Sequence, residues 1–203
     1  MKQLILIFTI FCAFLYNSID AEEDCVSKAK KITVNMTDCC KFPDLFDPKV
    51  YNETYDKVIA SNDAAVGTPL FDCLVEQTLF KDLQLADSSG NILNDKVKAY
   101  IKETIKDASW AKIATAAFQK CSTEAIKYGE NYQKLTGISK STCDFKFDAI
   151  ADCIDIASFG ECPKASWTTN DTITSDCVYL KDFIKDCYKN IAAINEFLDH
   201  QED

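Results

Sequence analysis

Cysteine is the residue type with the most varied chemistry in this chain of 203 residues. The chain contains 11 cysteines and one histidine, His200. Cysteine can bind zinc, act as a nucleophile or form disulfides. Zinc sites favour Cys-x2-Cys spacings with histidines nearby, and neither pattern occurs, so we expect no metal site and no cofactor. The cysteines are therefore interpreted as structural.

The N-terminal segment predicts where the protein folds. Lys2 and the apolar run from Leu4 to Tyr16 are typical of a signal peptide, which we place over residues 1–21. Removing it takes away Cys12 and leaves an even number of cysteines, as expected for paired disulfides in a secreted chain. Three N-glycosylation sequons agree with secretion and begin at Asn35, Asn52 and Asn170. No later segment approaches the roughly 20 apolar residues of a membrane helix, so stable membrane insertion is not expected.

Charge and motifs exclude several classes of function. The net charge is −10 and the sequence contains no arginine, which argues against nucleic-acid binding and against bidentate clamping of phosphate. There is no Gly-x-Ser-x-Gly, His-Glu-x-x-His or P-loop motif. Cys39 and Cys40 are adjacent, as at the active-site helix of secreted phospholipases A2, but no His-Asp pair follows them. Paired carboxylates could act as in glycosidases, yet no context marks a pair. We therefore expect no enzyme.

Apolar residues repeat with a helical period through most of the chain, which predicts an all-α fold with six to eight helices rather than a β-rich disulfide scaffold. Residues 22–203 are expected to form a single domain. One or two short helices are expected between Pro43 and Asn62, followed by helices from Pro69 to about Leu85 and from Asn94 to about Ile105. The next helices are expected from an N-cap at Ser109 through Cys121 and from Cys143 through Ala157. The last is expected to run for about five turns from Leu180 through Leu198.

Geometry limits how the cysteines pair without fixing the pairing. A bond between the neighbours Cys39 and Cys40 would form a strained ring, so each is expected to have a different partner. Cys177 and Cys187 lie ten residues apart, roughly 15 Å along one helix, and cannot bond to each other there. The disulfides are therefore expected to join helices to one another.

The order of the cysteines resembles that of the insect odorant-binding proteins. Cys153 and Cys162 have the eight-residue spacing of the last two cysteines of that family, and Cys121 ends the helix that contains Trp110. The extra cysteines resemble the Plus-C subgroup. Its marks are the segments Cys39-Cys40-x2-Pro43, Cys162-Pro163-x3-Trp167 and Cys177-x2-Leu180-x2-Phe183-Ile184-x2-Cys187.

This resemblance implies a helical domain around an apolar cavity, with residues 166–203 as a C-terminal extension. It also implies the disulfides Cys73–Cys153 and Cys121–Cys162. The family's third cysteine falls at Gln77, which is a departure from the pattern. The pairing of six cysteines stays open, namely Cys25, Cys39, Cys40, Cys143, Cys177 and Cys187.

The function implied is a secreted carrier of small hydrophobic, odorant-like or pheromone-like molecules in sensillar lymph or haemolymph. Neutral or cationic ligands fit the acidic charge better than anions, and a homodimer is possible. The alternative is a secreted helical effector, in haemolymph or saliva, that acts through protein–protein contacts. The residues expected to line the cavity are Val75, Leu79, Phe80, Ile113, Phe118, Phe147, Ile150, Ile154, Phe159, Leu180 and Ile184.

Overall fold

The computed structural model describes residues 24–61, 64–188, 190, 193–194 and 196–197. The expected signal peptide over residues 1–21 and His200 lie outside the described residues. The chain divides into two compact units, one of residues 42–162 and the other of the described residues within 1–41 and 163–203. The boundary at Pro163 lies close to the start of the expected C-terminal extension, and the single-domain organisation stays a prediction.

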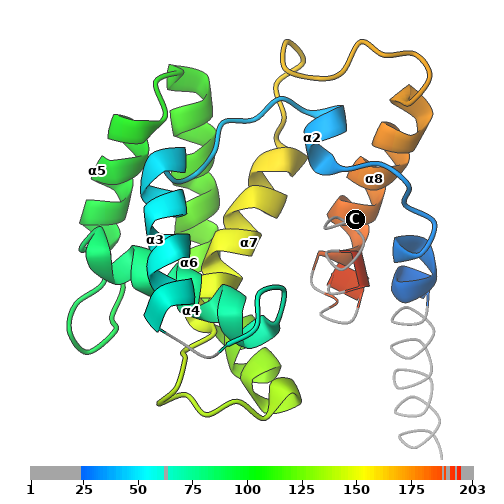
Figure 1. Ribbon diagram of the computed structural model, residues 1–203. Helices are drawn as coiled ribbons and strands as arrows, with labels where there is room; N and C mark the ends of the chain where they lie inside the picture. The colour runs from blue at the N-terminus through cyan, green and yellow to red at the C-terminus, as the bar shows by residue number, and fades with distance from the viewer. Residues whose placement is uncertain (1–23, 62–63, 189, 191–192, 195, 198–203) are drawn as a thin grey trace, which may run out of the picture. The chain divides into compact units, whose positions relative to one another are not determined.

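The described residues of the unit 42–162 form five helices, labelled in Figure 1. They are α3 (Pro48–Ser61), α4 (Pro69–Asp82), α5 (Asn94–Thr104), α6 (Ala108–Thr136) and α7 (Lys146–Gly160). The helix α6 packs along α7, α5 packs on α6, and α4 contacts both α3 and α7. The core between them is rich in fully buried phenylalanine rings, among them Phe71, Phe80, Phe118, Phe147 and Phe159.

The other unit contains α2 (Met36–Cys39) and α8 (Thr174–Cys187), which contact each other, and a helical turn over residues 24–29. Cys25–Cys187 and Cys39–Cys177 are disulfides that attach both N-terminal segments to α8. An antiparallel bridge pairs Cys40 with Trp167, and the Lys181 ammonium lies 5.0 Å from the Trp167 ring centroid. The described residues of the chain contain no strand longer than such a single bridge.

The all-α prediction is confirmed. The helices expected from Pro69, Asn94 and Cys143 appear as α4, α5 and α7, and one helix, α3, forms between Pro43 and Asn62. Three details were wrong. The helix expected to end at Cys121 is α6, which continues to Thr136. Asp107, not Ser109, caps α6, because its carboxylate accepts the N–H groups of Ser109 and Trp110 at 2.8 and 3.0 Å.

The third error concerns the helix expected from Leu180 through Leu198. The helix α8 begins at Thr174 and ends at Cys187. Beyond it, the Asn190 side chain accepts the N–H of Ala193 at 3.0 Å, a hydrogen bond typical of asparagine at an N-cap. Ile191 and Leu198 lie outside the described residues.

The disulfides implied by the resemblance were also wrong. Cys73 bonds to Cys143 rather than to Cys153, and Cys121 bonds to Cys153 rather than to Cys162. The physical reason is the packing, since α6 lies against α7 and brings Cys121 to Cys153. Cys143 precedes α7, beside α4. The geometric predictions are confirmed, because Cys39 does not bond to Cys40, nor Cys177 to Cys187. Cys40 and Cys162 are disulfide-bonded as well.

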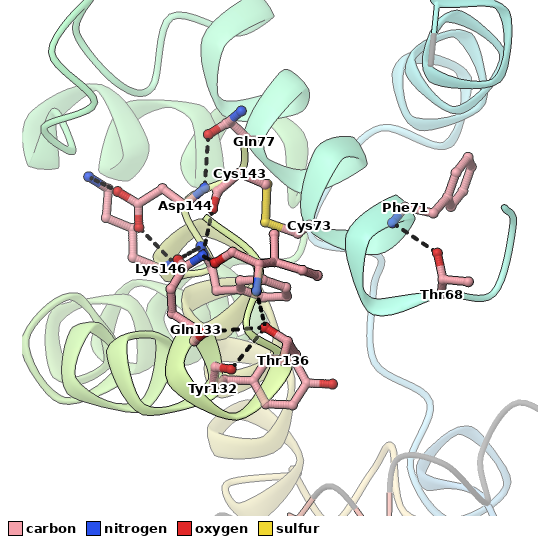
Figure 2. Close-up of a disulfide and its surroundings, with 12 residues drawn as sticks. Thr68, Phe71, Cys73, Gln77, Tyr132, Gln133, Thr136, Cys143, Asp144 and Lys146 are labelled. Carbon is pink, nitrogen blue, oxygen red and sulfur yellow. Dashed lines mark hydrogen bonds and ion pairs between the residues drawn. A yellow bond between two sulfur atoms is a disulfide. The ribbon is translucent and has the colours of Figure 1, made fainter. Parts of the chain in front are cut away.

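Gln77 fills the position where the resemblance places a cysteine. Figure 2 shows its side chain beside the Cys73–Cys143 bond, where its carbonyl oxygen accepts the N–H of Asp144 at 3.2 Å. From α6, Gln133 donates to the Cys143 carbonyl at 3.1 Å and accepts the N–H of Phe145 at 3.3 Å. The segment leading into α7 is therefore held by one disulfide and by two glutamine side chains.

Gly129 is required where α6 passes this segment. A Cβ atom at Gly129 would lie 2.8 Å from the Lys146 nitrogen and from the Phe145 carbonyl oxygen, which are backbone atoms that cannot rotate away. Gly160, near the end of α7, has no atom within 4 Å of the corresponding position. Gly129 therefore permits a close approach between the backbone of α6 and the backbone of Phe145 and Lys146. Gly160 has no such role.

We predict opposite effects of alanine at these two positions. Gly129→Ala should lower the free energy of unfolding by about 1–3 kcal/mol, the usual cost of overpacking. Gly160→Ala should leave it unchanged or raise it by up to about 1 kcal/mol, because alanine restricts the unfolded chain. Urea denaturation followed by circular dichroism measures both. Equal effects of the two substitutions would contradict the close approach.

Candidate functional site

A narrow pocket of about 10 Å³ lies within the unit of residues 42–162. Four elements supply its walls: the segment before α3, the end of α5, the first turns of α6 and the last turns of α7. The lining residues are Phe42, Pro43, Leu45, Ile105, Trp110, Ala114, Ile154, Asp155 and Ser158. The pocket is thus mainly apolar and aromatic, with a carboxyl and a hydroxyl group on α7.

The cap of α6 positions the aromatic wall. Hydrogen bonds from the Ser109 hydroxyl and from the backbone of Ser109 and Trp110 stabilise the Asp107 carboxylate and lower its pKa. Trp110 therefore lies in the first turn of α6, where its side chain is only 6% exposed. Its ring centroid is 6.4 Å from that of Phe42, whose side chain is half-buried. These two rings form one side of the pocket.

The polar side of the pocket consists of a hydroxyl group and a carboxyl group, both on α7. The Ser158 hydroxyl is buried and has no hydrogen-bond partner among the described residues. Asp155 is half-buried, and desolvation of its carboxyl group, with a smaller effect of the Asp44 charge, raises its pKa to about 7. A buried polar group without a partner carries a free-energy cost, and such groups are found most often where a ligand or catalysis uses them.

Asp155 belongs to a group of acidic residues that we call the carboxylate cluster, defined as Asp72, Glu76, Asp148, Asp152 and Asp155. Asp148, Asp152 and Asp155 follow one another at helical spacing on α7, and Asp72 and Glu76 do so on α4, the helix that packs against α7. Burial is the largest influence on Glu76 and Asp148, and it raises the pKa of both well above the usual range, with further contributions from neighbouring carboxylates.

Glu76 is the member of the carboxylate cluster that has a buried oxygen atom, Oε2, without a hydrogen-bond partner among the described residues. The negative charges of Asp152, Asp155 and Asp72 all disfavour its ionised form. On the neighbouring helix α3, burial and the charge of Glu76 raise the pKa of Tyr51 to about 12. The cluster is therefore a group of half-buried acidic residues in which the protonated forms of Glu76 and Asp148 are favoured.

The residues expected to line a cavity are mostly in the core of this unit. Val75, Leu79, Phe80, Phe118, Phe147, Ile150 and Phe159 are at most 2% exposed, and Ile113 is half-buried. Leu180 and Ile184 are buried in α8, within the other unit. Ile154 is the one predicted residue among those that line the pocket. That the remaining residues contact a ligand stays a prediction.

The sequence analysis did not select Phe42, Trp110, Asp155 or Ser158 as site residues. Trp110 lies on the apolar stripe of its helix and is expected to be buried on that ground alone. Asp155 is one of 32 acidic residues, so no single carboxylate stands out by residue type. A usable signal lies in α7, whose carboxylates alternate with isoleucine and alanine around most of the helix.

A second, more open hollow of about 600 Å³ lies over α5 and α6. Lysines 102, 106 and 112 border it, together with alanine and threonine side chains. It has few large apolar groups and is open to water, so it offers little of the desolvation that binding of a small apolar molecule needs. The narrow pocket is the better candidate for such a ligand.

None of the helices formed by the described residues is long and apolar enough to cross a membrane. No three histidine, cysteine, aspartate or glutamate side chains of that part of the chain are placed to hold a metal ion together.

The fold and pocket define a class of small helical proteins, crosslinked by disulfides, with an apolar pocket between helices. The chain matches no protein-family model. It is 23% identical over 164 residues to General odorant-binding protein 68 of Anopheles gambiae, and the match covers 79% of this chain and 74% of that protein. The chain is thus similar to an insect odorant-binding protein over most of its length.

The raised pKa of Asp155 predicts how stability depends on pH. Since the folded state holds the proton up to about pH 7 and an unfolded aspartate loses it near pH 4, ionisation lowers the free energy of unfolding as the pH rises through this window. Asp155→Asn should therefore stabilise the protein at about pH 8, by about 1.4 kcal/mol for each unit of pKa difference, and have little effect near pH 4. Urea denaturation at both pH values measures this.

The matched control is Asp182→Asn, which removes the same charge from an exposed position on α8. It should leave the pH dependence of the parent protein unchanged. An Asp155→Asn variant with the same pH dependence as the parent would show that the Asp155 carboxyl is exposed to solvent.

Proposed function

We propose that the protein is a secreted carrier of small hydrophobic molecules, related to the Plus-C odorant-binding proteins. Similarity to an odorant-binding protein over 164 residues supports the class, and the oxidised state of ten cysteines supports an extracellular location. Binding without reaction needs no catalytic group. It needs apolar walls that remove ligand surface from water, worth roughly 25 cal/mol per Å².

The observation that carries this proposal is the pocket. Phe42, Ile105 and Trp110 offer apolar surface, the Ser158 hydroxyl has no hydrogen-bond partner among the described residues, and the Asp155 carboxyl lines the same pocket. Ligand sites typically combine a mainly apolar lining with a few polar groups that fix orientation. No comparable combination occurs at the hollow over α5 and α6.

Entry of a ligand requires the walls to part. A volume of about 10 Å³ holds at most one water molecule. The wall formed by Phe42 and Pro43 is the one suited to move, since both residues are half-buried and precede the first helix of their unit. By contrast, Trp110, Ile154 and Ser158 are buried on helices. A ligand would therefore displace Phe42 and contact Trp110.

Tryptophan fluorescence tests this proposal directly, because the chain has two tryptophans and only Trp110 lines the pocket. In a Trp167→Phe variant, titration with a neutral apolar ligand such as phenethyl alcohol should change the emission of Trp110 in a saturable way. The matched variant Trp110→Phe reports Trp167 alone and should show no saturable change. Ile154→Asp, which places a charge in the apolar lining, should weaken binding at least about tenfold.

The carrier proposal would be wrong if oxidised Trp167→Phe protein showed no saturable change with any of a panel of neutral apolar ligands. It would also be wrong if both single-tryptophan variants responded alike, because that pattern indicates nonspecific quenching. Circular dichroism of each variant confirms that the helices are formed.

Secretion is tested by glycosylation. Asn35, Asn52 and Asn170 are all exposed, and Asn170 forms a local turn by accepting hydrogen bonds from the backbone N–H and the hydroxyl of Thr172. Expression in insect cells should therefore give secreted protein whose mass falls on treatment with an N-glycosidase. Replacing the three asparagines by glutamine should abolish that shift. Retention of the protein inside the cell without glycans would contradict the secretory route.

A further inference from the structure

We propose that Ser158 determines which ligands the pocket accepts. Its hydroxyl donates a hydrogen bond to an oxygen atom of a small, neutral and otherwise apolar molecule, such as an alcohol. This inference rests on the proposed carrier function and narrows its ligand class to molecules that carry an oxygen, as opposed to hydrocarbons. It depends on the place of one side chain in the pocket and on the hydrogen bond that this side chain lacks.

The Ser158 hydroxyl is buried and unpaired. Ser158 is 6% exposed, and its Oγ atom has no hydrogen-bond partner among the described residues. In helices a hydroxyl often donates to the carbonyl oxygen four residues earlier, as Thr115 of α6 does to Ala111 at 2.6 Å. The Ser158 hydroxyl makes no such bond to the carbonyl of Ile154, and Ser158 lines the pocket.

A serine at this position has a free-energy cost in the ligand-free protein. A buried hydroxyl without a partner gives up its hydrogen bonds to water and gains none in return. Alanine would avoid that cost and has a higher helix propensity than serine. Stability of the ligand-free protein therefore does not account for Ser158, whereas a ligand that completes the hydrogen bond does.

A single water molecule is the alternative partner, because a volume of about 10 Å³ is near the lower limit for one. Buried waters typically make about three hydrogen bonds, and the side chains around the pocket supply two polar groups, those of Ser158 and Asp155. A water held by few partners is readily displaced by a ligand oxygen that takes over its bond to Ser158.

Helical spacing places the apolar and polar parts of the pocket next to each other. Ile154 and Ser158 lie four residues apart on α7, so their Cβ atoms are about 5–6 Å apart on one face. Trp110 and Ala114 have the same spacing on α6, the helix that packs along α7. A molecule whose apolar part lies against Trp110 and Ile154 therefore reaches Ser158 with an oxygen two or three bonds further along.

Ser158 is a better anchor for a neutral ligand than Asp155, the other polar residue of the lining. Asp155 is half-buried, whereas Ser158 is only 6% exposed, so a hydrogen bond at Ser158 is better shielded from water. A hydrogen bond between a hydroxyl and a neutral oxygen also requires no charge to be removed from water. The site should therefore distinguish a neutral oxygen from a methyl group of the same size.

The experiment compares phenethyl alcohol with propylbenzene, in which a methyl group replaces the hydroxyl. Trp110 fluorescence measures the affinity of each ligand for the oxidised Trp167→Phe protein and for the same protein with Ser158→Ala. The substitution should weaken binding of phenethyl alcohol at least about fivefold, which corresponds to about 1 kcal/mol. It should leave binding of propylbenzene unchanged or make it tighter. Following each ligand between the two proteins cancels the difference in hydrophobicity between the ligands.

Stability without ligand separates this role from a structural one. Ser158→Ala should leave the midpoint of urea denaturation unchanged or raise it, because it removes an unpaired buried hydroxyl. The matched control is Ser122→Ala on α6. Ser122 is half-buried, donates to the Gln119 carbonyl at 3.1 Å and lies outside the pocket lining, so the control should bind both ligands as the parent protein does.

The possible outcomes separate the two proposals. If Ser158→Ala changed the affinity for both ligands equally, or for neither, the role of Ser158 would be overturned and the carrier function would stand. A lower urea midpoint of Ser158→Ala with unchanged binding of phenethyl alcohol would also overturn it, because that result indicates a bound water only. Failure of both ligands to bind the parent protein would overturn the role of Ser158 together with carrier function for ligands of this size.

Discussion

The packing of α6 against α7 is the constraint on which the rest of the unit of residues 42–162 depends. Cys121–Cys153 bonds the two helices, and the backbone approach at Gly129 brings α6 against the residues that lead into α7. With these contacts in place, Ile150 and Ile154 are buried. The rotation of α7 about its axis is thereby fixed, and so is the direction of its carboxylates.

That rotation has an energetic consequence. The carboxylates of α7 occur at helical spacing, so they share a face, and this face meets the acidic residues of α4. Like charges in a region of low dielectric disfavour one another's ionisation, and burial adds to this effect. The Cys73–Cys143 bond and the hydrogen bond from Asp144 to Gln77 hold α4 to the segment before α7 beside this unfavourable region. A covalent crosslink and a hydrogen bond thus hold α4 to the segment before α7 beside carboxyl groups that disfavour one another's ionisation.

The helices were predictable because apolar periodicity and end signals are local. Pro69, for example, predicts the start of the helix that the structure shows at that residue. Ser109 was mistaken for a cap because Asp107 and Ser109 are both capping residues, and only the backbone direction decides between them. The cysteine pairing depends on which helices meet, which is not local information. A family pattern with one cysteine missing at Gln77 therefore transferred the wrong partners to Cys73 and Cys121.

The pocket was less predictable for a related reason. An apolar stripe shows which side of a helix is buried, yet it cannot show where the buried side is incompletely filled. The sequence of α7 nevertheless contains the relevant information. Its apolar residues lie on more than one face, including Ala149, Ile150, Ala151, Ile154 and Ile156, all of which are buried. A helix that is apolar around most of its circumference must be buried around most of it, so its carboxylates are partly removed from water as well. Partial burial disfavours their ionised forms, as the raised pKa values of Asp148 and Asp155 indicate. The pattern of α7 thus marks the part of the unit in which polar groups border an incompletely filled core.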